Sequence, residues 1–426
     1  MITSPAWKDK KYAVLGLARS GRATVEALLA AGANVLVWDD RAEAREPFAG
    51  RCAIGDPLEA DLTGYAGVVV SPGVPLNTHP IKPHADSFGV PVIGDIELFA
   101  QARANLPPHK VVGITGTNGK STTTALVHHI LKTAGVPTTM GGNIGLPILE
   151  QEPLPAGGVY VLELSSYQID LTYSLDCYIA VLLNVTPDHL DRYDGDFEKY
   201  VAAKIRLFEM QEADGLKLIG TSDAASSAAY ERFFESAQPV TRQEYPDQPD
   251  WPSLQGPHNR ENVSAAILTA FWFDIPESSL DQALRTFPGL PHRMQRVAEI
   301  SGVAYVNDSK GTNTAASAPA LAAFDNIHWI LGGLAKEPGL GECEAELPHV
   351  KAAYTIGKAG PQFATLLEGR VPVEQCETLD RAVASAAAKA EAGDTVLLSP
   401  ACASFDQYAD FEKRGDHFRE LVEGLK

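Results

Sequence analysis

The sequence predicts a three-domain α/β protein. Short apolar runs alternate with helical patterns along the chain, which is typical of largely parallel sheets joined by helices. The 426 residues exceed what one hydrophobic core usually organises. Two proline-containing stretches, Ala104–His109 and Phe287–Pro291, interrupt the patterns, so we expect domains at residues 1–105, 106–290 and 291–426.

The first domain is predicted to be Rossmann-like, with strands at Tyr12–Leu17, Val35–Trp38 and Gly67–Val70. After the first strand, residues recur at the spacing of one helix face: Val25, Leu28, Leu29 and Gly32. The turn before this helix reads Gly16-Leu-Ala-Arg-Ser-Gly21, and Asp39 ends the next strand. This pattern is similar to a dinucleotide-binding fingerprint, so a nicotinamide-dependent oxidoreductase is one candidate function.

The second domain begins at Lys110, with strands expected at Val111–Thr115, Tyr160–Leu164 and Tyr178–Leu183. A glycine-rich loop, Gly113-Ile-Thr-Gly-Thr-Asn-Gly-Lys-Ser-Thr122, stands between the first strand and a helix. Such a loop turns backbone N–H groups and the helix dipole toward an anion. Its first glycine departs from the strict phosphate-loop spacing, and an ordinary glycine-rich turn is the alternative. The residues predicted to bind ATP are Gly116, Thr117, Asn118, Gly119, Lys120, Ser121 and Thr122.

Candidate Mg²⁺ ligands of this domain, besides Ser121, are Glu163, His189 and Lys204. Glu163 lies in an otherwise apolar strand, where a carboxylate is costly unless it is paired or bound to a metal. His189 follows another strand at the edge where α/β sheets bind ligands. The alternatives are a salt-bridged core glutamate and a structural loop histidine.

Lys204 shares one predicted helix face with Val201, Ile205 and Phe208, which marks it as buried. Burial lowers the pKa of an ammonium, and a neutral lysine can add CO₂ to become a carbamate, an oxygen ligand for Mg²⁺. A core lysine paired with an acid is the alternative.

Another predicted helix opens with His258-Asn-Arg-Glu-Asn262 and carries apolar residues on one face: Val263, Ala266, Ile267, Ala270 and Phe271. Asn262 lies on that inward face, where it would touch a nucleotide, whereas Asn259 is either a ligand or only the helix N-cap. The third domain is predicted from strands at Ala304–Asn307, His328–Leu331, Ala353–Ile356 and Thr395–Leu398.

Composition excludes several classes of function. The net charge of −19 argues against a surface for nucleic acid or anionic membranes. Five cysteines stand singly, so neither a zinc site nor a disulfide framework is expected. No signal peptide or membrane span is recognisable, and we expect a cytoplasmic protein.

The motifs together resemble those of the ATP-dependent Mur ligases, the peptide-adding enzymes of peptidoglycan precursor synthesis, and within them the D-glutamate-adding branch. The resemblance extends nearly end to end, and besides the phosphate loop and Lys204 its segments are Leu15–Gly21, Ser71–Gly73, Gly141–Gly145, Leu162–Ser166, Asn184–His189, His258–Asn262, His292–Arg293, Asn307–Lys310, Leu331–Gly333 and Ser399–Ser404.

The resemblance implies a monomeric three-domain enzyme that binds a UDP-sugar, ATP and an amino acid in successive domains. Its substrates would be UDP-N-acetylmuramoyl-L-alanine, D-glutamate and ATP, and the reaction would pass through an acyl phosphate. Lys120 would contact the γ-phosphate, one Mg²⁺ would lie at Ser121 and Glu163, and a second Mg²⁺ would lie between His189 and a carbamylated Lys204.

The remaining roles also follow from the resemblance. ATP would be contacted by Asn259, Asn262, Arg293 and Asp308. The UDP-substrate would be contacted by Ala18, Arg19, Asp39, Asp40, Ser71, Gly73 and Asn143. D-Glutamate would be held by Thr312, Lys336, Ser404, Phe405 and Phe411. Two positions depart from the family pattern: Gly311 stands where alanine is expected, and Lys336 is not followed by the usual Asp-Phe.

Other functions explain fewer of these motifs. In an oxidoreductase, Ala18 would crowd the pyrophosphate and the phosphate loop would have no use. If the protein were a non-catalytic ATP-binding regulator, no function would explain His189, Lys204 and Ser399–Ser404. Sibling ligases that add a different amino acid, or folylpolyglutamate synthetase, share the ATP-binding domain, although the N-terminal domain argues against the folate enzyme.

Overall fold

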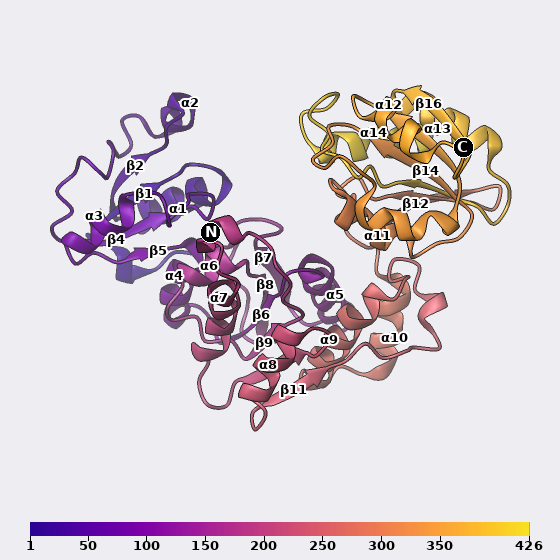
Figure 1. Ribbon diagram of the computed structural model, residues 1–426. Helices are drawn as coiled ribbons and strands as arrows, with labels where there is room; N and C mark the ends of the chain where they lie inside the picture. Colours follow the sequence, from indigo (N-terminus) through magenta and orange to yellow (C-terminus); the bar gives the residue numbers. More distant parts are fainter. Residues whose placement is uncertain (426) are drawn as a thin grey trace. The chain divides into compact units, whose positions relative to one another are not determined.

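The computed structural model describes residues 1–425, and at His258 it describes the backbone alone. The chain forms two compact units, of which the first comprises residues 1–242 and 261–280. The second comprises residues 243–260 and those from 281 onward. The first unit contains two sheets and the second contains one (Figure 1). The predicted three-domain α/β class is confirmed, while the domain boundaries at residues 105 and 290 stay predictions.

The N-terminal sheet is parallel, with the strand order β3-β2-β1-β4-β5. Helices α1 and α4 pack on one face, and α3 packs on the other. The elements are β1 (Lys11–Leu15), α1 (Arg19–Ala30), β2 (Asn34–Trp38), α2 (Ala42–Arg45), β3 (Ala53–Ile54), β4 (Tyr65–Val70), α3 (Ile81–Ser87), β5 (Val92–Ile93) and α4 (Asp95–Ala102).

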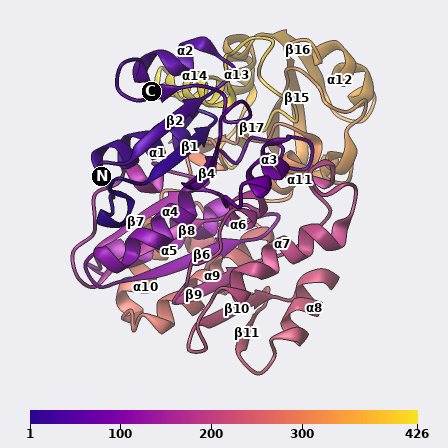
Figure 2. The same cartoon turned by 90° about the vertical axis from the view of Figure 1, so that its left-hand side faces the viewer.

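The central sheet is also parallel, with the order β11-β10-β9-β6-β8-β7. Helix α5 lies on one side of it, and α6 and α7 lie on the other (Figure 1). The elements are β6 (His109–Thr115), α5 (Lys120–Thr133), β7 (Thr138–Gly142), β8 (Gly158–Glu163), α6 (Ser166–Asp170), β9 (Ile179–Leu182), η5 (Leu190–Tyr193), α7 (Phe197–Glu209), β10 (Leu216–Gly220), α8 (Ala224–Arg232), β11 (Ala237–Val240), α9 (His258–Trp272) and α10 (Glu277–Thr286). The N-terminal and central domains share one continuous hydrophobic core, and Figure 2 shows their elements in a second view.

The C-terminal sheet has the order β12-β13-β17-β14-β15-β16, and only the pairing of β12 with β13 is antiparallel. Alternate residues of its strands face α11 and α12 on one side and α13 and α14 on the other. The elements are β12 (Gln295–Ile300), β13 (Val303–Asn307), α11 (Thr314–Leu321), β14 (Ile327–Gly332), β15 (Val350–Ile356), α12 (Gly360–Leu367), β16 (Val373–Glu377), α13 (Leu379–Lys389), β17 (Thr395–Leu398) and α14 (Phe411–Glu423).

Two details of the helix α9 correct the sequence predictions. Phe271 was expected on its inward face but is 70% exposed, because that face is centred on Val263, Ala266 and Ala270. Asn259 is not the N-cap, since the helix already begins at position 258 and the Asn259 side chain donates to the Gln255 carbonyl. No helix within residues 1–425 has the length and apolar character needed to cross a bilayer.

Candidate active site

The phosphate loop joins β6 to α5, and a glycine caps the helix. Gly119 has a φ of 83°, and a Cβ at this position would collide with Oδ1 of Asn262. Only glycine therefore allows the loop to close against α9. Lys120, Ser121 and Thr122 occupy the first turn of α5, where N–H groups are open to an anion.

A second strand end holds this loop in place. Asn184, just beyond β9, accepts from the Asn118 N–H through Oδ1 at 2.8 Å and from the Thr117 N–H through its carbonyl at 2.8 Å. The ammonium of Lys120 folds back over the loop and donates to the carbonyls of Gly116 (2.9 Å) and Thr117 (2.7 Å). Residues 116–119 thus form an ordered loop, and residues 120–122 continue from it as the first turn of α5.

The orientation of Asn184 depends on Glu261, a residue for which the sequence pattern predicted no role. Glu261 is buried, and its Oε2 accepts from Nδ2 of Asn184 at 3.3 Å while its Oε1 accepts from Ser222 at 2.8 Å. Because the Asn184 amide gives its N–H to Glu261, its oxygen faces the phosphate loop. The position of Glu261 between Asn259 and Asn262 was the signal that could have revealed it.

Glu163 ends β8 beside the phosphate loop and is almost fully buried. Its Oε1 accepts from Nδ2 of Asn143 at 2.8 Å, whereas Oε2 has no hydrogen-bond partner within the described part of the chain. No ion pair involves this carboxylate there, so the alternative of a salt-bridged glutamate is wrong. A buried carboxylate oxygen without a partner, with Ser121 also at this sheet edge, fits a Mg²⁺ ligand.

Lys204 is buried in α7, as its helical phase predicted. Its Nζ donates to the Gly116 carbonyl at 2.9 Å and lies 4.5 Å from the ring centroid of Tyr200. Burial, followed by the nearby charge of Lys120, holds the pKa of Lys204 well below its usual value. The described part of the chain contains no ion pair between Lys204 and a carboxylate, although the charges of Asp188 and Asp170 act to raise its pKa. The role of Lys204 as a carbamylated metal ligand stays a prediction.

His189 is exposed, has a φ of 53°, and is the N-cap residue of the short helix η5. Its Nε2 lies 3.5 Å from the carboxylate of Asp188, and its ring lies 5.3 Å from that of Tyr167. Among the side chains that the structure describes, which leave out His258, no cluster of three or more His, Cys, Asp or Glu is preformed to hold a metal ion. The metal role of His189 therefore remains a prediction.

The residues predicted to bind the UDP-substrate surround the first strand–helix turn of the N-terminal domain. Asp39 accepts from the Leu17 N–H at 2.7 Å, and Ser71 donates to the Gly16 carbonyl at 2.8 Å. Arg19 reaches the central domain and donates to the Gly145 carbonyl at 2.8 Å. Ala18, Arg19, Asp40 and Gly73 are exposed, and Asn143, two residues before Gly145, donates to Glu163.

In the second unit, Asp308 follows β13 and is buried. It accepts from Ser399 Oγ at 2.7 Å and from the Met294 N–H at 3.1 Å. Burial raises the pKa of Asp308 to about 7, against the opposing effects of the Ser399 hydrogen bond and the Arg293 charge.

A buried arginine, also missed in the sequence, connects the C-terminal motifs. Arg414 donates to Ser309 Oγ (3.0 Å) and to the carbonyls of Ser309 (2.9 Å), Cys402 (3.1 Å) and Gly332 (3.5 Å). It thereby joins segments 307–310, 331–333 and 399–404. Its helical phase with Phe418 and Val422 on α14 was the signal that marked it as inward-facing.

The residues predicted to hold D-glutamate lie around the same strand ends. Ser404 is buried and Phe411 half-buried, whereas Lys336 and Phe405 are exposed. Thr312 follows Gly311, where a Cβ would come within 2.6 Å of Ser317 Oγ and 2.8 Å of Asp308 Oδ2. The expected alanine at position 311 would therefore not fit this network without movement.

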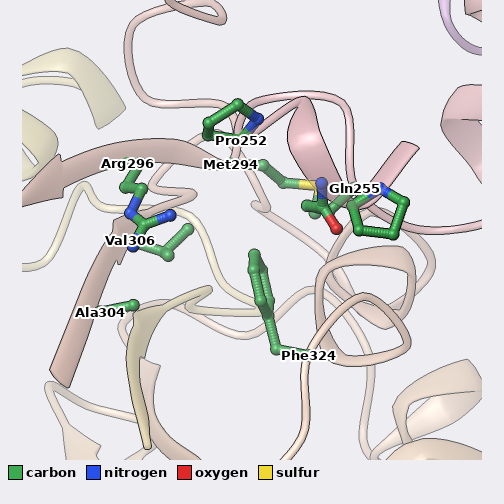
Figure 3. A pocket seen from close by; sticks show the side chains of 8 residues that line it. Pro252, Gln255, Met294, Arg296, Ala304, Val306 and Phe324 are labelled. Carbon is green, nitrogen blue, oxygen red and sulfur yellow. The ribbon is translucent and has the colours of Figure 1, made fainter. Parts of the chain in front are cut away.

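The second unit also contains a cavity of about 220 Å³. Met294 and Phe324 extend into it, with Pro252 and Arg296 at its wall (Figure 3). None of the residues predicted to bind substrate, ATP or metal lines it, so it is not part of the candidate active site.

Family models match all three domains. They are described as "Mur ligase MurD-like, N-terminal domain" over residues 10–94, "Mur ligase middle domain" over 114–245 and "Mur ligase, glutamate ligase domain" over 292–402. The UDP-N-acetylmuramoylalanine–D-glutamate ligase of Novosphingobium aromaticivorans is 61% identical, with 100% of this chain and 97% of that protein covered. The chain belongs to the Mur ligase family.

Further Mur ligases agree with this assignment. The UDP-N-acetylmuramoylalanine–D-glutamate ligase of Sphingopyxis alaskensis is 57% identical over the full length of both chains. The solved UDP-N-acetylmuramate–alanine ligase of Thermotoga maritima has the same fold, with a TM-score of 0.60 at 17% identity, covering 98% of this chain and 100% of that one. The MurF ligase of T. maritima, solved with ADP, also has a TM-score of 0.60 at 14% identity, covering 99% and 97%.

Proposed function

We propose that this chain is an ATP-dependent ligase that joins D-glutamate to UDP-N-acetylmuramoyl-L-alanine in the cytoplasm. Full-length identity of 61% to a ligase named for these substrates supports the substrate pair. The observation that carries the chemistry is the buried Glu163 oxygen without a partner beside the ordered loop that begins α5. That arrangement suits a nucleoside triphosphate with its Mg²⁺.

The proposed reaction has two steps. The alanyl carboxylate attacks the γ-phosphorus of ATP, which forms an acyl phosphate and releases ADP. The D-glutamate amine then attacks the acyl carbon, loses its proton, and expels inorganic phosphate as the amide forms. The ammonium of Lys120, now held by two loop carbonyls, would exchange these for oxygens of the transferred phosphoryl group.

Ser121 and Glu163 would hold one Mg²⁺, and His189 with a carbamylated Lys204 would hold another. Bound Mg²⁺ supplies electrostatic stabilisation of charge developing on phosphoryl oxygens. The carbamate would form when the neutral Lys204 amine attacks CO₂ and releases a proton. Burial without a paired acid supports this modification, because both favour the neutral amine. The roles of Asn259, Asn262, Arg293, Asp308 and the D-glutamate set are proposed as the family resemblance implies.

Phosphate release tests the proposal directly. The full-length enzyme is incubated with ATP, Mg²⁺ and UDP-N-acetylmuramoyl-L-alanine, and single amino acids are then added. Turnover is expected with D-glutamate and not with L-glutamate or meso-diaminopimelate. Equal turnover with either of the latter would contradict the assignment, and oxidation of NADPH without phosphate release would favour an oxidoreductase.

A further inference from the structure

The loop after His189 is tied to the N-terminal domain by one side chain. Arg192, in η5, donates through Nη2 to the carbonyls of Pro72 (3.0 Å) and Val74 (2.7 Å) and through Nη1 to that of Gly73 (3.3 Å). Three consecutive carbonyls of one domain therefore converge on a guanidinium of the other. Such a planar fork of donors fixes both distance and orientation.

An aromatic ring holds the guanidinium and the candidate metal ligand together. The Cζ atom of Arg192 lies 4.2 Å from the ring centroid of Tyr167. The ring of Tyr167 also lies 5.3 Å from the ring of His189. Arg192 and His189 are thus placed by the same side chain, so a displacement of one is transmitted to the other. A bond of 2.9 Å from Asn77 Nδ2 to the Asp191 carbonyl reinforces the junction.

The two loops serve opposite ends of the same substrate in the proposed function. Segment 71–74 follows β4, carries Ser71 and Gly73, and is bonded through Ser71 to the Gly16 turn that would receive the diphosphate. His189, on the central domain, would act at the carboxylate that receives the phosphoryl group. The separation of these two sites must match the length of the substrate.

We propose that Arg192 is a positioning residue that sets the distance between the UDP-binding loop and the His189 loop, and so presents the substrate carboxylate to the ATP site. This inference rests on the proposed function. A misplacement of about 1 Å between reacting groups can cost on the order of 10²-fold in rate. The residue itself touches neither reacting atom.

The test is steady-state kinetics of full-length Arg192→Met and Arg192→Lys with each substrate varied in turn. For Arg192→Met, KM for the UDP-substrate should rise about tenfold, which is about 1.4 kcal/mol, and kcat should fall about tenfold. KM for ATP should stay within twofold. Arg192→Lys keeps the charge and a donor, so it should recover part of both losses. Calorimetric titration should show weaker binding of the UDP-substrate and unchanged binding of ADP.

Arg206 provides a matched control. It faces the ring of Tyr173 with its Cζ 5.3 Å from the centroid and donates to the carbonyls of Asp170 (3.3 Å) and Thr172 (2.9 Å), all in the central domain. Arg206→Met should lower thermal stability without moving KM for the UDP-substrate. Arg192→Met with a lower melting temperature and normal KM values would overturn the positioning role, as would equal KM changes in both variants. A wild-type enzyme without ligase turnover would instead refute the proposed function.

Discussion

The central and C-terminal domains both bury charged groups, but they satisfy them to different degrees. Arg414 gives four hydrogen bonds to protein oxygens, and both carboxylate oxygens of Asp308 have donors. Lys204 finds one carbonyl within residues 1–425, and one oxygen of Glu163 finds no donor there. Burying a polar group without partners is costly. The buried charged groups of the C-terminal network therefore have protein partners, whereas one oxygen of Glu163 in the central domain has none in the described part of the chain.

This comparison predicts that substitutions in the C-terminal network lower stability, whereas substitutions in the central site lower activity. Arg414→Met removes the donor partner of a buried hydrogen-bond network, and breaking a buried charged pairing by removing one partner costs about 3–5 kcal/mol. We expect about 3–5 kcal/mol of lost stability in the C-terminal domain, seen as faster hydrogen exchange in α14 and β17. Arg419 on the same helix is partly exposed and pairs with Asp416, so Arg419→Met should change exchange little. Equal hydrogen-exchange protection in both variants would contradict the inference that Arg414 stabilises the C-terminal domain by joining these segments.

Lys120→Ala should affect chemistry rather than stability. Removing one charge that follows the transferred phosphoryl group is expected to lower kcat by about 10²–10³-fold, by analogy with the loss of an oxyanion-hole donor. The melting temperature should stay close to that of the wild type. Lys132, exposed in the last turn of the same helix, is the control, and Lys132→Ala should keep normal turnover. A near-normal kcat in a folded Lys120→Ala enzyme would contradict the proposed role of Lys120 in binding the transferred phosphoryl group.

Lys204→Ala should lose activity by about 10²-fold, on the order expected for a disturbed metal site, with little loss of stability. Acetate or formate should restore part of the rate by supplying an oxygen ligand. Intact mass spectrometry of the wild type in bicarbonate should show the added CO₂. Lys199, exposed on α7 and paired with Asp194, is the control. An unmodified Lys204 in fully active, Mg²⁺-loaded enzyme would refute the carbamate.

A different kind of effect is expected from Asp308, namely a pH dependence of stability. The folded protein holds this proton to about pH 7, whereas the ordinary aspartate value is 3.8. Folding therefore takes up a proton between these values, and stability falls as pH rises from about 4 to 7, by on the order of 1 kcal/mol per pH unit. Asp308→Asn should remove this decline when melting temperatures are compared at pH 5 and pH 8. Parallel pH profiles in the two proteins would contradict the assignment.

Asp394 offers a control of opposite sign. Burial acts to raise its pKa, but contacts with Lys351, the Glu391 N–H and His328 lower it below the usual value. Its contribution to stability should be present at neutral pH and lost as pH falls below about 4. Asp394→Asn should therefore change how the melting temperature depends on pH below about 4. Above pH 5 the pH profile of the variant should run parallel to that of the wild type.

The sequence alone determined the three-domain α/β class, the phosphate loop and the buried face of α7 that carries Lys204. These features depend on residue period and local turn chemistry, which neighbouring positions encode. Short or partly polar strands such as β3, β5 and β16 were missed, since a run of two to five residues shows little periodicity. Local patterns also could not show that Phe271 lies beyond the contact face of α9.

Only the tertiary structure decided which distant residues meet. The partner of Asn184 is Glu261, the side chain that closes on Gly119 is Asn262, and the carbonyls held by Arg192 belong to another domain. The same holds for Gly311, where a Cβ would come within 2.9 Å of Ser399 Oγ in addition to crowding the nearby Asp308 and Ser317. The contact with Ser399, like those of Asn184, Gly119 and Arg192, joins segments that are far apart in sequence. Their geometry arises from strand order and helix packing, which no local pattern of residue types contains.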